Sequence, residues 1–356
     1  MSPPRVAING FGRIGRLVTR ALLQAPASQR VELVAINDVS APEMLGHLFQ
    51  FDSLHGRWQG TVDVVEGGLR IDGTFVRVLK ETDPAKLPWR DLGIDYVIEA
   101  TGKFTGRADL QKHLDAGAKR VLLSAPAKSG GADVTLVRGV NSDAYDPAKH
   151  RIVSNSSCTT NALAPVLKVL HDAHGLEHAA VTTVHAYTND QRLLDQPHSD
   201  YRRARAAGVN IVPTSTGAAS AIKAVLPELV GRVEGLAVRV PVGNVSLLDI
   251  TARLRGPVTK EQLEHTFWQA ANGPLKGILE AEWRSLVSTD FNHHPASVVV
   301  DLPGSMVMGH DVVKILAWYD NEWAYANRLA EVLGDLWRRE PAAAEAKVAA
   351  GARVGA

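Results

Sequence analysis

A glycine-rich turn near the N-terminus constrains the fold more than any other feature of this chain. The short apolar run Arg5–Asn9 leads directly into Gly10-Phe11-Gly12-Arg13-Ile14-Gly15. An amphipathic stretch follows, and a second apolar run, Val31–Ile36, is followed by Asp38, which lies 23 residues beyond the last glycine. A strand that turns tightly into a helix and continues into another strand is the repeating unit of a doubly wound parallel sheet. The pattern therefore predicts an α/β fold of the Rossmann type.

Each part of this turn has a physical role in binding a dinucleotide. Gly10 permits the tight turn, Gly12 lets the backbone approach a pyrophosphate, and Gly15 lets helix and strand pack closely. The helix N-terminus adds free N–H groups and the positive end of a dipole. Asp38 can accept hydrogen bonds from ribose hydroxyls, and its charge repels a 2′-phosphate. We expect a site that favours NAD over NADP; the alternative is a glycine-rich turn that binds nothing.

Composition narrows the class of protein. At 356 residues the chain exceeds what one core usually serves, which favours two domains. The net charge of +1 gives no general attraction to nucleic acid or membranes. A single cysteine excludes an internal disulfide framework and a CxxC zinc motif, and we expect no metal site. The absence of a secretory signal pattern and of a long apolar run favours the cytoplasm.

The pattern of the chain changes after about residue 150. Long β-branched runs, often alternating, replace the strand–helix alternation and predict a large mixed or antiparallel sheet. We expect a Rossmann domain over residues 1–157 and an α+β catalytic domain over 158–319. Residues 321–337 have a helical pattern, and the Ala-rich residues 341–356 predict a flexible tail.

Cys158, the only cysteine, lies in the polar segment SNSSCTTN directly before a helical pattern. The capping residues before Ala162–Ala173, with Pro165 in the first turn, predict that Cys158 lies at the helix start. The dipole and free N–H groups there stabilise a thiolate and lower its pKa. A single cysteine is more often buried and inert, so the position alone leaves both interpretations open.

His185 supplies a partner for that thiol. It ends a predicted strand in TVHAYTND, and a Cys–His pair can act as nucleophile, base and acid. A cysteine hydrolase would fit this pair equally well. The predicted dinucleotide site instead favours covalent oxidation of an aldehyde, in which the sulfur adds to the aldehyde, a hydride leaves for NAD and a thioester remains.

Several groups suited to phosphate lie in the second half of the chain. Arginines occupy positions 202, 203 and 205, Thr216-Gly217 opens a predicted helix, and Arg239 ends a predicted strand. Guanidinium groups and a helix N-terminus are good ligands for phosphate. Most of the arginine run could equally form a solvated or subunit-contacting face.

Seven motifs in order give the chain a clear resemblance. INGFGRIGR, SNSSCTTNALAP, VHAYTNDQ, RRARAA, VPTSTGAA, RVPVGNVSLLD and WYDNEWAYANR resemble phosphorylating glyceraldehyde-3-phosphate dehydrogenases, from about residue 4 to 338. The resemblance implies glyceraldehyde 3-phosphate and inorganic phosphate as substrates and a homotetramer. It also implies that a helix over about 320–340 completes the Rossmann domain, and that residues 186–207 reach a neighbouring subunit's cofactor.

The resemblance assigns roles residue by residue. Cys158 matches the nucleophile and His185 the base. The positions where the family binds the attacking or the substrate phosphate are Ser157, Thr159, Thr188, Arg203, Thr216, Gly217 and Arg239. Cofactor contacts fall on Gly10, Gly12, Arg13, Ile14, Gly15, Asp38, Ser124 and Asn321, the last of which orients the nicotinamide carboxamide.

The chain also departs from the family pattern. Ala162 stands where most relatives have a second cysteine, and Thr82 replaces an arginine near the adenine. Gly130-Gly131 resembles a small insertion. Gln196 replaces the leucine of NAD-specific members, but Asp38 is kept, so we expect NAD as main cofactor and NADP as a secondary one.

Two alternatives are kept. Erythrose-4-phosphate dehydrogenase belongs to the same family, and VSTDFNHHP has some of its character. A non-catalytic protein that binds dinucleotide or RNA is disfavoured, because no basic and aromatic stripe is present.

Overall fold

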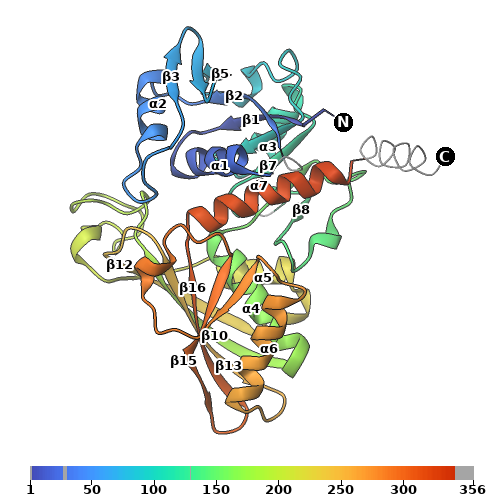
Figure 1. The fold of residues 1–356 in the computed structure, drawn as a ribbon, viewed down its shortest axis with the longest axis vertical. Coiled ribbons are helices and arrows are strands. Elements are labelled where there is room, and N and C mark those ends of the chain that lie inside the picture. The colour runs from blue at the N-terminus through green and yellow to red at the C-terminus, as the bar shows by residue number, and fades with distance from the viewer. Residues whose placement is uncertain (1, 27–29, 129, 341–356) are drawn as a thin grey trace, which may run out of the picture. The chain divides into compact units, whose positions relative to one another are not determined.

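The computed structural model describes residues 2–26, 30–128 and 130–340, and the predicted flexible tail, residues 341–356, lies outside them. The chain forms two compact units. Among the described residues, the first contains those of 2–136, 143–156 and 326–340, and the second contains residues 137–142 and 157–325 (Figure 1). Each unit has its own sheet.

The first unit is built on a nine-stranded sheet with the order β3-β4-β5-β2-β1-β6-β7-β9-β8. In this order, neighbouring strands from β5 through β2, β1, β6, β7 and β9 to β8 pair in parallel. Strands β3, β4 and β5 form an antiparallel edge. Its elements are β1 (Arg5–Asn9), α1 (Arg13–Gln24), β2 (Glu32–Asn37), α2 (Pro42–Gln50), β3 (Val62–Val65), β4 (Gly68–Ile71), β5 (Thr74–Leu79), β6 (Tyr96–Glu99), α3 (Arg107–Asp115), β7 (Arg120–Leu123), β8 (Val134–Thr135) and β9 (Ile152–Ser154). The predicted doubly wound parallel sheet is confirmed. Because the strand order reverses at β1, the carboxyl end of β1 is the expected place for a ligand crevice.

The second unit is built on a seven-stranded sheet with the order β11-β12-β10-β13-β16-β15-β14. Most pairs are antiparallel, but β10 with β12 and β14 with β15 are parallel, so the sheet is mixed as predicted. Its elements are α4 (Cys158–His174), β10 (Leu176–Ala186), β11 (Val212–Thr214), α5 (Ala218–Val225), β12 (Val233–Val240), β13 (Ser246–Leu254), α6 (Lys260–Asn272), β14 (Leu279–Glu282), β15 (Val298–Met308) and β16 (Val312–Tyr319). The helices α4, α5 and α6 lie on one side of this sheet (Figure 1).

Helix α4 begins at Cys158, which confirms the predicted place of this residue at the helix start. The Ser157 side chain caps the helix by accepting a hydrogen bond from the backbone N–H of Thr160 at 3.1 Å. Pro165 therefore lies inside the helix, and its predicted place in the first turn is wrong. The helix continues through the proline because the apolar residues around it, such as Val166, are fully buried in the core of the unit.

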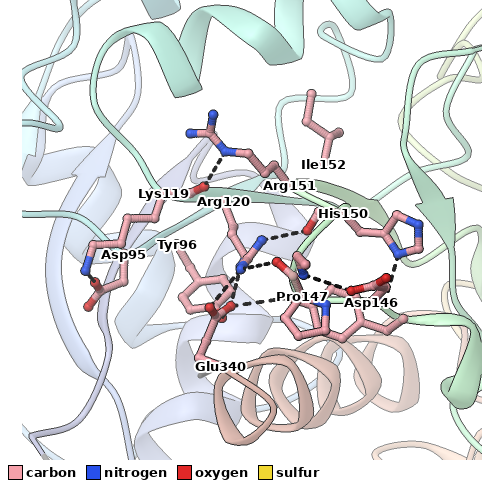
Figure 2. A network of polar contacts seen from close by, with 12 residues as sticks. Asp95, Tyr96, Lys119, Arg120, Asp146, Pro147, His150, Arg151, Ile152 and Glu340 are labelled. Carbon is pink, nitrogen blue, oxygen red and sulfur yellow. Dashed lines mark hydrogen bonds and ion pairs between the residues drawn. The ribbon is translucent and has the colours of Figure 1, made fainter. Parts of the chain in front are cut away.

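The final helix, α7 (Trp323–Arg338), ends in a buried polar network (Figure 2). The Glu340 carboxylate pairs with the Arg120 guanidinium, with 2.7 Å between Oε2 and Nη2. Tyr96 and Tyr145 donate their hydroxyl hydrogens to the same carboxylate at 3.0 and 3.3 Å. Burial and the Glu340 charge raise the pKa of Tyr96, so this phenol remains a donor. Arg120 lies at the start of β7, so the network joins the chain after α7 to the parallel sheet.

Neither a membrane span nor a metal cluster occurs in the part of the chain that the structure describes. No helix there combines the length and apolar character needed to cross a bilayer. No group of three or more His, Cys, Asp or Glu side chains there is arranged to hold a metal ion.

The Glu340 network predicts a specific loss of stability. The substitution Glu340→Gln leaves the Arg120 charge without its counter-ion, and we expect the free energy of unfolding to fall by about 2 kcal/mol. Lys149→Ala removes an exposed ion pair with Asp146 and should change the free energy of unfolding by less than about 0.5 kcal/mol. Urea unfolding followed by tryptophan fluorescence compares the two variants. Equal effects would show that the buried pair adds no more than a surface one.

Candidate active site

Helix α4 and strand β10 bring Cys158 and His185 together. Cys158 is the first residue of α4, and His185 is the last residue but one of β10. The Cys158 Sγ atom lies 3.7 Å from Nε2 of His185. His185 is buried, and Cys158 is partly buried. A thiol and an imidazole at this distance can exchange a proton directly.

Nδ1 of His185 has two polar neighbours, one an acceptor and one a donor. Nδ1 lies 2.7 Å from the carbonyl oxygen of Ala186, an acceptor. Nη1 of Arg239, a donor, also contacts Nδ1. With its hydrogen on Nδ1 the neutral imidazole donates to the carbonyl, and without it Nδ1 accepts from Arg239. The first tautomer leaves Nε2 as the acceptor that faces the Cys158 thiol, which is the orientation that a general base requires.

The pKa of Cys158 is shifted in the direction opposite to the one expected. Burial raises the pKa of the Cys158 thiol, and the lowering effects of the Arg239 charge and the Thr159 hydrogen bond do not offset it. The prediction that the helix start lowers this pKa is therefore wrong, because burial in the packed interior outweighs the helix N-terminus. Burial, followed by the Arg239 charge, lowers the pKa of His185 to about 3. The pair rests as a thiol and a neutral imidazole.

Arg239 gives the site its positive charge. Its Nη1 atom donates to the Ala186 carbonyl at 3.0 Å and contacts Nδ1 of His185. Its Nε atom is buried and has no hydrogen-bond partner among the described residues. Burial and the nearby charge of Arg203 both lower the pKa of Arg239. An unpaired donor and two cations close together are stabilised by an anion between them.

Arg203 is held by neighbouring groups of the same unit. Its guanidinium pairs with Asp190 at 2.6 Å, donates from Nε to the Thr214 hydroxyl at 3.0 Å, and donates to the Ser215 carbonyl at 3.2 Å. To bind phosphate, Arg203 would have to exchange the Asp190 carboxylate for it.

The other predicted phosphate ligands lie on separate segments. Thr188 follows β10 by two residues, the Thr216 hydroxyl accepts a hydrogen bond from the Ala218 N–H at 3.2 Å, and Gly217 is the N-cap of α5. Within the described residues, no hydrogen bond joins these three to Cys158 or His185. Thr159 does reach the pair, with its hydroxyl 3.9 Å from the Cys158 sulfur.

The glycine-rich turn of the first unit has the geometry of a dinucleotide cradle. Gly10 has φ +93°, and a Cβ there would lie 2.6 Å from the backbone nitrogen of Thr101. A Cβ on Gly15 would lie 2.1 Å from the Gly10 carbonyl oxygen. A Cβ on Gly12 would meet nothing within 4 Å, so only this glycine leaves open space at the helix start. The turn thus fits a ligand that approaches the backbone at Gly12.

A cavity of about 220 Å³ adjoins the turn. Its lining includes Asn9, Gly10, Gly12, Asn37, Asp38 and Thr82. The Asp38 carboxylate accepts backbone N–H groups of Phe11 at 2.8 Å and Ser40 at 2.9 Å. These hydrogen bonds lower its pKa, although burial opposes them, so a fixed negative charge lies in the cavity wall.

The remaining predicted cofactor contacts have individual settings. Arg13 pairs with Asp52 at 2.7 Å, and Ile14 is the second residue of α1. Ser124 directly follows β7, and its backbone N–H donates to the Glu99 carbonyl at 2.9 Å. In the second unit, Oδ1 of Asn321 accepts the Ser246 hydroxyl at 2.8 Å.

Sequence reasoning missed two buried polar residues beside these sites. Tyr319, the last residue of β16, packs its ring edge-on against His185 with centroids 5.9 Å apart. Asn9, at the end of β1, donates to the Glu99 carboxylate at 2.6 Å beneath the cavity. The alternation of VVKILAWY places Tyr319 on the buried face of its strand, and a buried tyrosine hydroxyl needs a partner. That signal could have identified it.

The same substitution at Gly15 and at Gly12 of the dinucleotide turn should have opposite effects on stability. Gly15→Ala forces its Cβ onto the Gly10 carbonyl and should destabilise the fold by about 2 kcal/mol. Gly12→Ala adds a methyl group in open space at φ −72°, so stability should be kept while NAD affinity falls about tenfold. Thermal unfolding and calorimetric titration with NAD measure both. Wild-type affinity in Gly12→Ala would argue against a pyrophosphate at this position.

Comparison with known proteins agrees with this arrangement. Residues 4–107 match the family model described as the NAD binding domain of glyceraldehyde 3-phosphate dehydrogenase, and residues 157–321 match the model of its C-terminal domain. The chain is 52% identical over 328 residues to glyceraldehyde-3-phosphate dehydrogenase 1 of Bacillus subtilis (strain 168), covering 92% of this chain and 96% of the relative. It is 49% identical over 328 residues to the enzyme of that name from Geobacillus stearothermophilus, with the same coverage. The resemblance seen in the motifs is confirmed, and the chain belongs to the glyceraldehyde-3-phosphate dehydrogenase family.

Proposed function

We propose that this protein oxidises D-glyceraldehyde 3-phosphate with NAD and inorganic phosphate to give 1,3-bisphosphoglycerate. The observation that carries the proposal is the contact of 3.7 Å between the Cys158 sulfur and Nε2 of His185, beside the unpaired buried Nε of Arg239. The chain thus contains a nucleophile, a base and an anion-binding donor, and its residues 4–107 match an NAD binding domain.

Cys158 acts as the nucleophile, and His185 transfers the protons. Nε2 of His185 takes the thiol proton while the sulfur adds to the aldehyde carbon, and returns it to the former carbonyl oxygen, which gives a hemithioacetal. NAD, when bound, would supply the acceptor for the hydride that leaves this carbon, and the now neutral His185 takes the hydroxyl proton. An oxygen of inorganic phosphate then attacks the resulting thioester and its proton passes to solvent. The carbon–sulfur bond breaks, the acyl phosphate leaves, and the sulfur takes back the proton that His185 holds.

Phosphate binding falls to the basic and hydroxyl groups around the pair. We expect the attacking and the substrate phosphate to use the following residues: Ser157, Thr159, Thr188, Arg203, Thr216, Gly217 and Arg239. Arg239 is the best placed of the arginines, because its buried Nε atom lacks a hydrogen-bond partner among the described residues. Arg203 is expected to exchange its contact with Asp190 for a phosphate oxygen.

NAD is the main cofactor in this proposal and NADP a secondary one. The fixed carboxylate of Asp38 repels a 2′-phosphate, whereas the amide of Gln196 could donate a hydrogen bond to one. We expect Asn321 to hold the nicotinamide carboxamide through its amide nitrogen, because its oxygen already accepts from Ser246. We expect the protein to act in the cytoplasm, in glycolysis or gluconeogenesis.

Cys158→Ser tests the mechanism directly. A hydroxyl at this position is a far weaker nucleophile than a thiol, so kcat should fall by at least about a thousandfold. Steady-state assays should compare glyceraldehyde 3-phosphate with erythrose 4-phosphate, and NAD with NADP, each with and without phosphate. NAD affinity is the control, since Cys158→Ser leaves the dinucleotide turn intact.

Other results of these assays would change the proposal in defined ways. A higher kcat/KM for erythrose 4-phosphate would favour the sister enzyme, and a higher value with NADP would overturn the cofactor preference. Substantial activity in Cys158→Ser would exclude the covalent mechanism. NAD binding without turnover of either aldehyde by the wild-type protein would favour a non-catalytic dinucleotide-binding protein.

We also propose that the chain assembles as a homotetramer, partly through residues 186–207. This segment exposes Leu193, Leu194 and Tyr201, whose exposed fractions are 84%, 69% and 90%. Large apolar side chains gathered on one exposed segment mark an interaction surface. No nucleic acid or membrane is expected as a partner.

If residues 186–207 form a subunit interface, charged residues introduced there should weaken the tetramer. Leu193→Asp together with Leu194→Asp should convert tetramers to smaller species, because burying two carboxylates without partners is costly. Trp268→Asp changes an exposed residue of α6 and serves as the control that keeps the wild-type mass. Analytical ultracentrifugation measures all three proteins. A tetramer that persists in the double variant would place the interface elsewhere.

A further inference from the structure

The hydroxyl of Tyr319 joins the two elements that carry the Cys158–His185 pair. It lies 3.0 Å from the hydroxyl of Thr159, the residue after Cys158 in α4. It also lies 2.8 Å from the hydroxyl of Thr183, two residues before His185 in β10. All three hydroxyl-bearing residues are buried, with 5% of Thr159 and 1% each of Thr183 and Tyr319 exposed. Tyr319 takes no part in the proton transfers between Cys158 and His185.

The direction of these hydrogen bonds follows from counting protons. Three hydroxyl hydrogens are shared among Thr183, Tyr319 and Thr159, and the only hydrogen-bond partner of the Thr183 side chain among the described residues is Tyr319. If Thr183 accepted from Tyr319, its own hydrogen would be buried without an acceptor, which costs about 1–3 kcal/mol. Thr183 therefore donates to Tyr319, and Tyr319 donates to Thr159.

This direction leaves the Thr159 hydrogen free for the site. The Thr159 hydroxyl already accepts from Tyr319, and its second contact is the Cys158 sulfur at 3.9 Å. Burial and the charge of Cys158 raise the pKa of Tyr319, so the phenol keeps its hydrogen while the reaction proceeds. The Ser246 hydroxyl also contacts the phenol, but it already donates to Asn321 and accepts the Ala186 N–H. The Tyr319 hydrogen therefore goes to Thr159, whose hydroxyl has no other nitrogen or oxygen partner among the described residues.

We propose that Tyr319 is a positioning residue that turns the Thr159 hydroxyl into a fixed donor, first to the Cys158 thiolate and then to the attacking phosphate. The second half rests on the function proposed above. A hydrogen bond from Thr159 stabilises the negative sulfur as it forms. Once the sulfur carries the acyl group and is neutral, the same hydrogen is available to a phosphate oxygen. Tyr319 touches neither and acts through Thr159.

Alkylation of Cys158 tests the first half without any substrate. Cys158 is the only cysteine, so the rate of reaction with iodoacetamide reports this sulfur alone. Tyr319→Phe keeps the ring against His185 and removes the hydroxyl. We expect alkylation at pH 7 to slow on the order of tenfold, and the pH profile to move to higher pH, since a hydrogen bond to a charged group is lost. Tyr145→Phe, another buried tyrosine that loses a hydrogen bond, is the matched control and should stay within about twofold of wild type.

A second pair of variants covers the case in which Tyr319→Phe fails to fold. Thr183→Val removes the hydrogen bond that polarises and anchors the phenol, and should slow alkylation about threefold. Thr183→Ser restores the hydroxyl and should restore the rate. Alkylation of Tyr319→Phe at the rate of Tyr145→Phe, or of Thr183→Ser as slowly as Thr183→Val, would overturn the proposal.

Phosphate kinetics test the second half. Tyr319→Phe should raise the KM for phosphate about tenfold, while NADH formed in the first turnover without phosphate keeps its amplitude. An unchanged KM for phosphate would refute this part. If the wild-type protein forms no NADH from glyceraldehyde 3-phosphate, the proposed function fails, and the alkylation rates still decide whether Tyr319 orients Thr159.

Discussion

The register of strand β10 between its two neighbours is the constraint on which the site depends. The parallel pairing of β10 with β12 places Arg239 directly beside His185. On the other side of β10, the backbone N–H of Ala186 donates to the Ser246 hydroxyl of β13, and Ser246 is itself paired with Tyr319 of β16. A slip of one residue in β10 would turn His185 to the opposite face of the sheet and separate it from both Arg239 and Cys158. The register therefore assembles a base, a cation and a positioning phenol from four strands.

The electrostatics of this assembly favour negative charge on the substrate side. Arg239 favours the thiolate of Cys158 and disfavours an imidazolium at His185. Cys158 and His185 are therefore both uncharged at rest, and charge develops on them only as the sulfur attacks. Burial and this guanidinium together lower the pKa of His185, and the guanidinium also presents an unpaired Nε donor to an anion. Binding of a phosphate would offset the positive charge and make protonation of His185 less costly, so anion binding and proton transfer are coupled through Arg239.

Much of the fold and the chemical identity of the site could be predicted from the sequence. The glycine turn and Asp38 are close in sequence to the elements they serve, and period and spacing were enough to predict the parallel sheet around them. Cys158 and His185 were identified by their local motifs, and the structure brings them to 3.7 Å. These features depend on neighbours within a few tens of residues, which a sequence pattern can represent.

What the sequence could not provide depends on tertiary packing. The raised pKa of Cys158 results from burial, which the surrounding polar letters do not indicate. The contact of Arg203 with Asp190 arises in a long segment without periodicity. Tyr319 and Thr159 are 160 residues apart, and their hydrogen bond requires the register of the whole sheet. Burial and the Tyr319 contact depend on segments distant in sequence, whereas the Arg203–Asp190 contact spans only 13 residues but lies where no periodicity indicates the local structure.

The two helix N-termini at the predicted sites show how local capping divides their roles. Helix α1 begins after Gly12, which offers no side-chain cap, so the backbone N–H groups of its first turn are left for a ligand. Helix α4 begins after Ser157, whose hydroxyl accepts the N–H of Thr160. One of the free donors of α4 is thereby used inside the protein, which weakens its effect on the Cys158 sulfur. An uncapped helix start suits the binding of an anion, whereas a capped one holds a reactive side chain in a fixed place. The thiol then depends on side-chain donors, Thr159 and Arg239, for the stabilisation that the helix end does not supply.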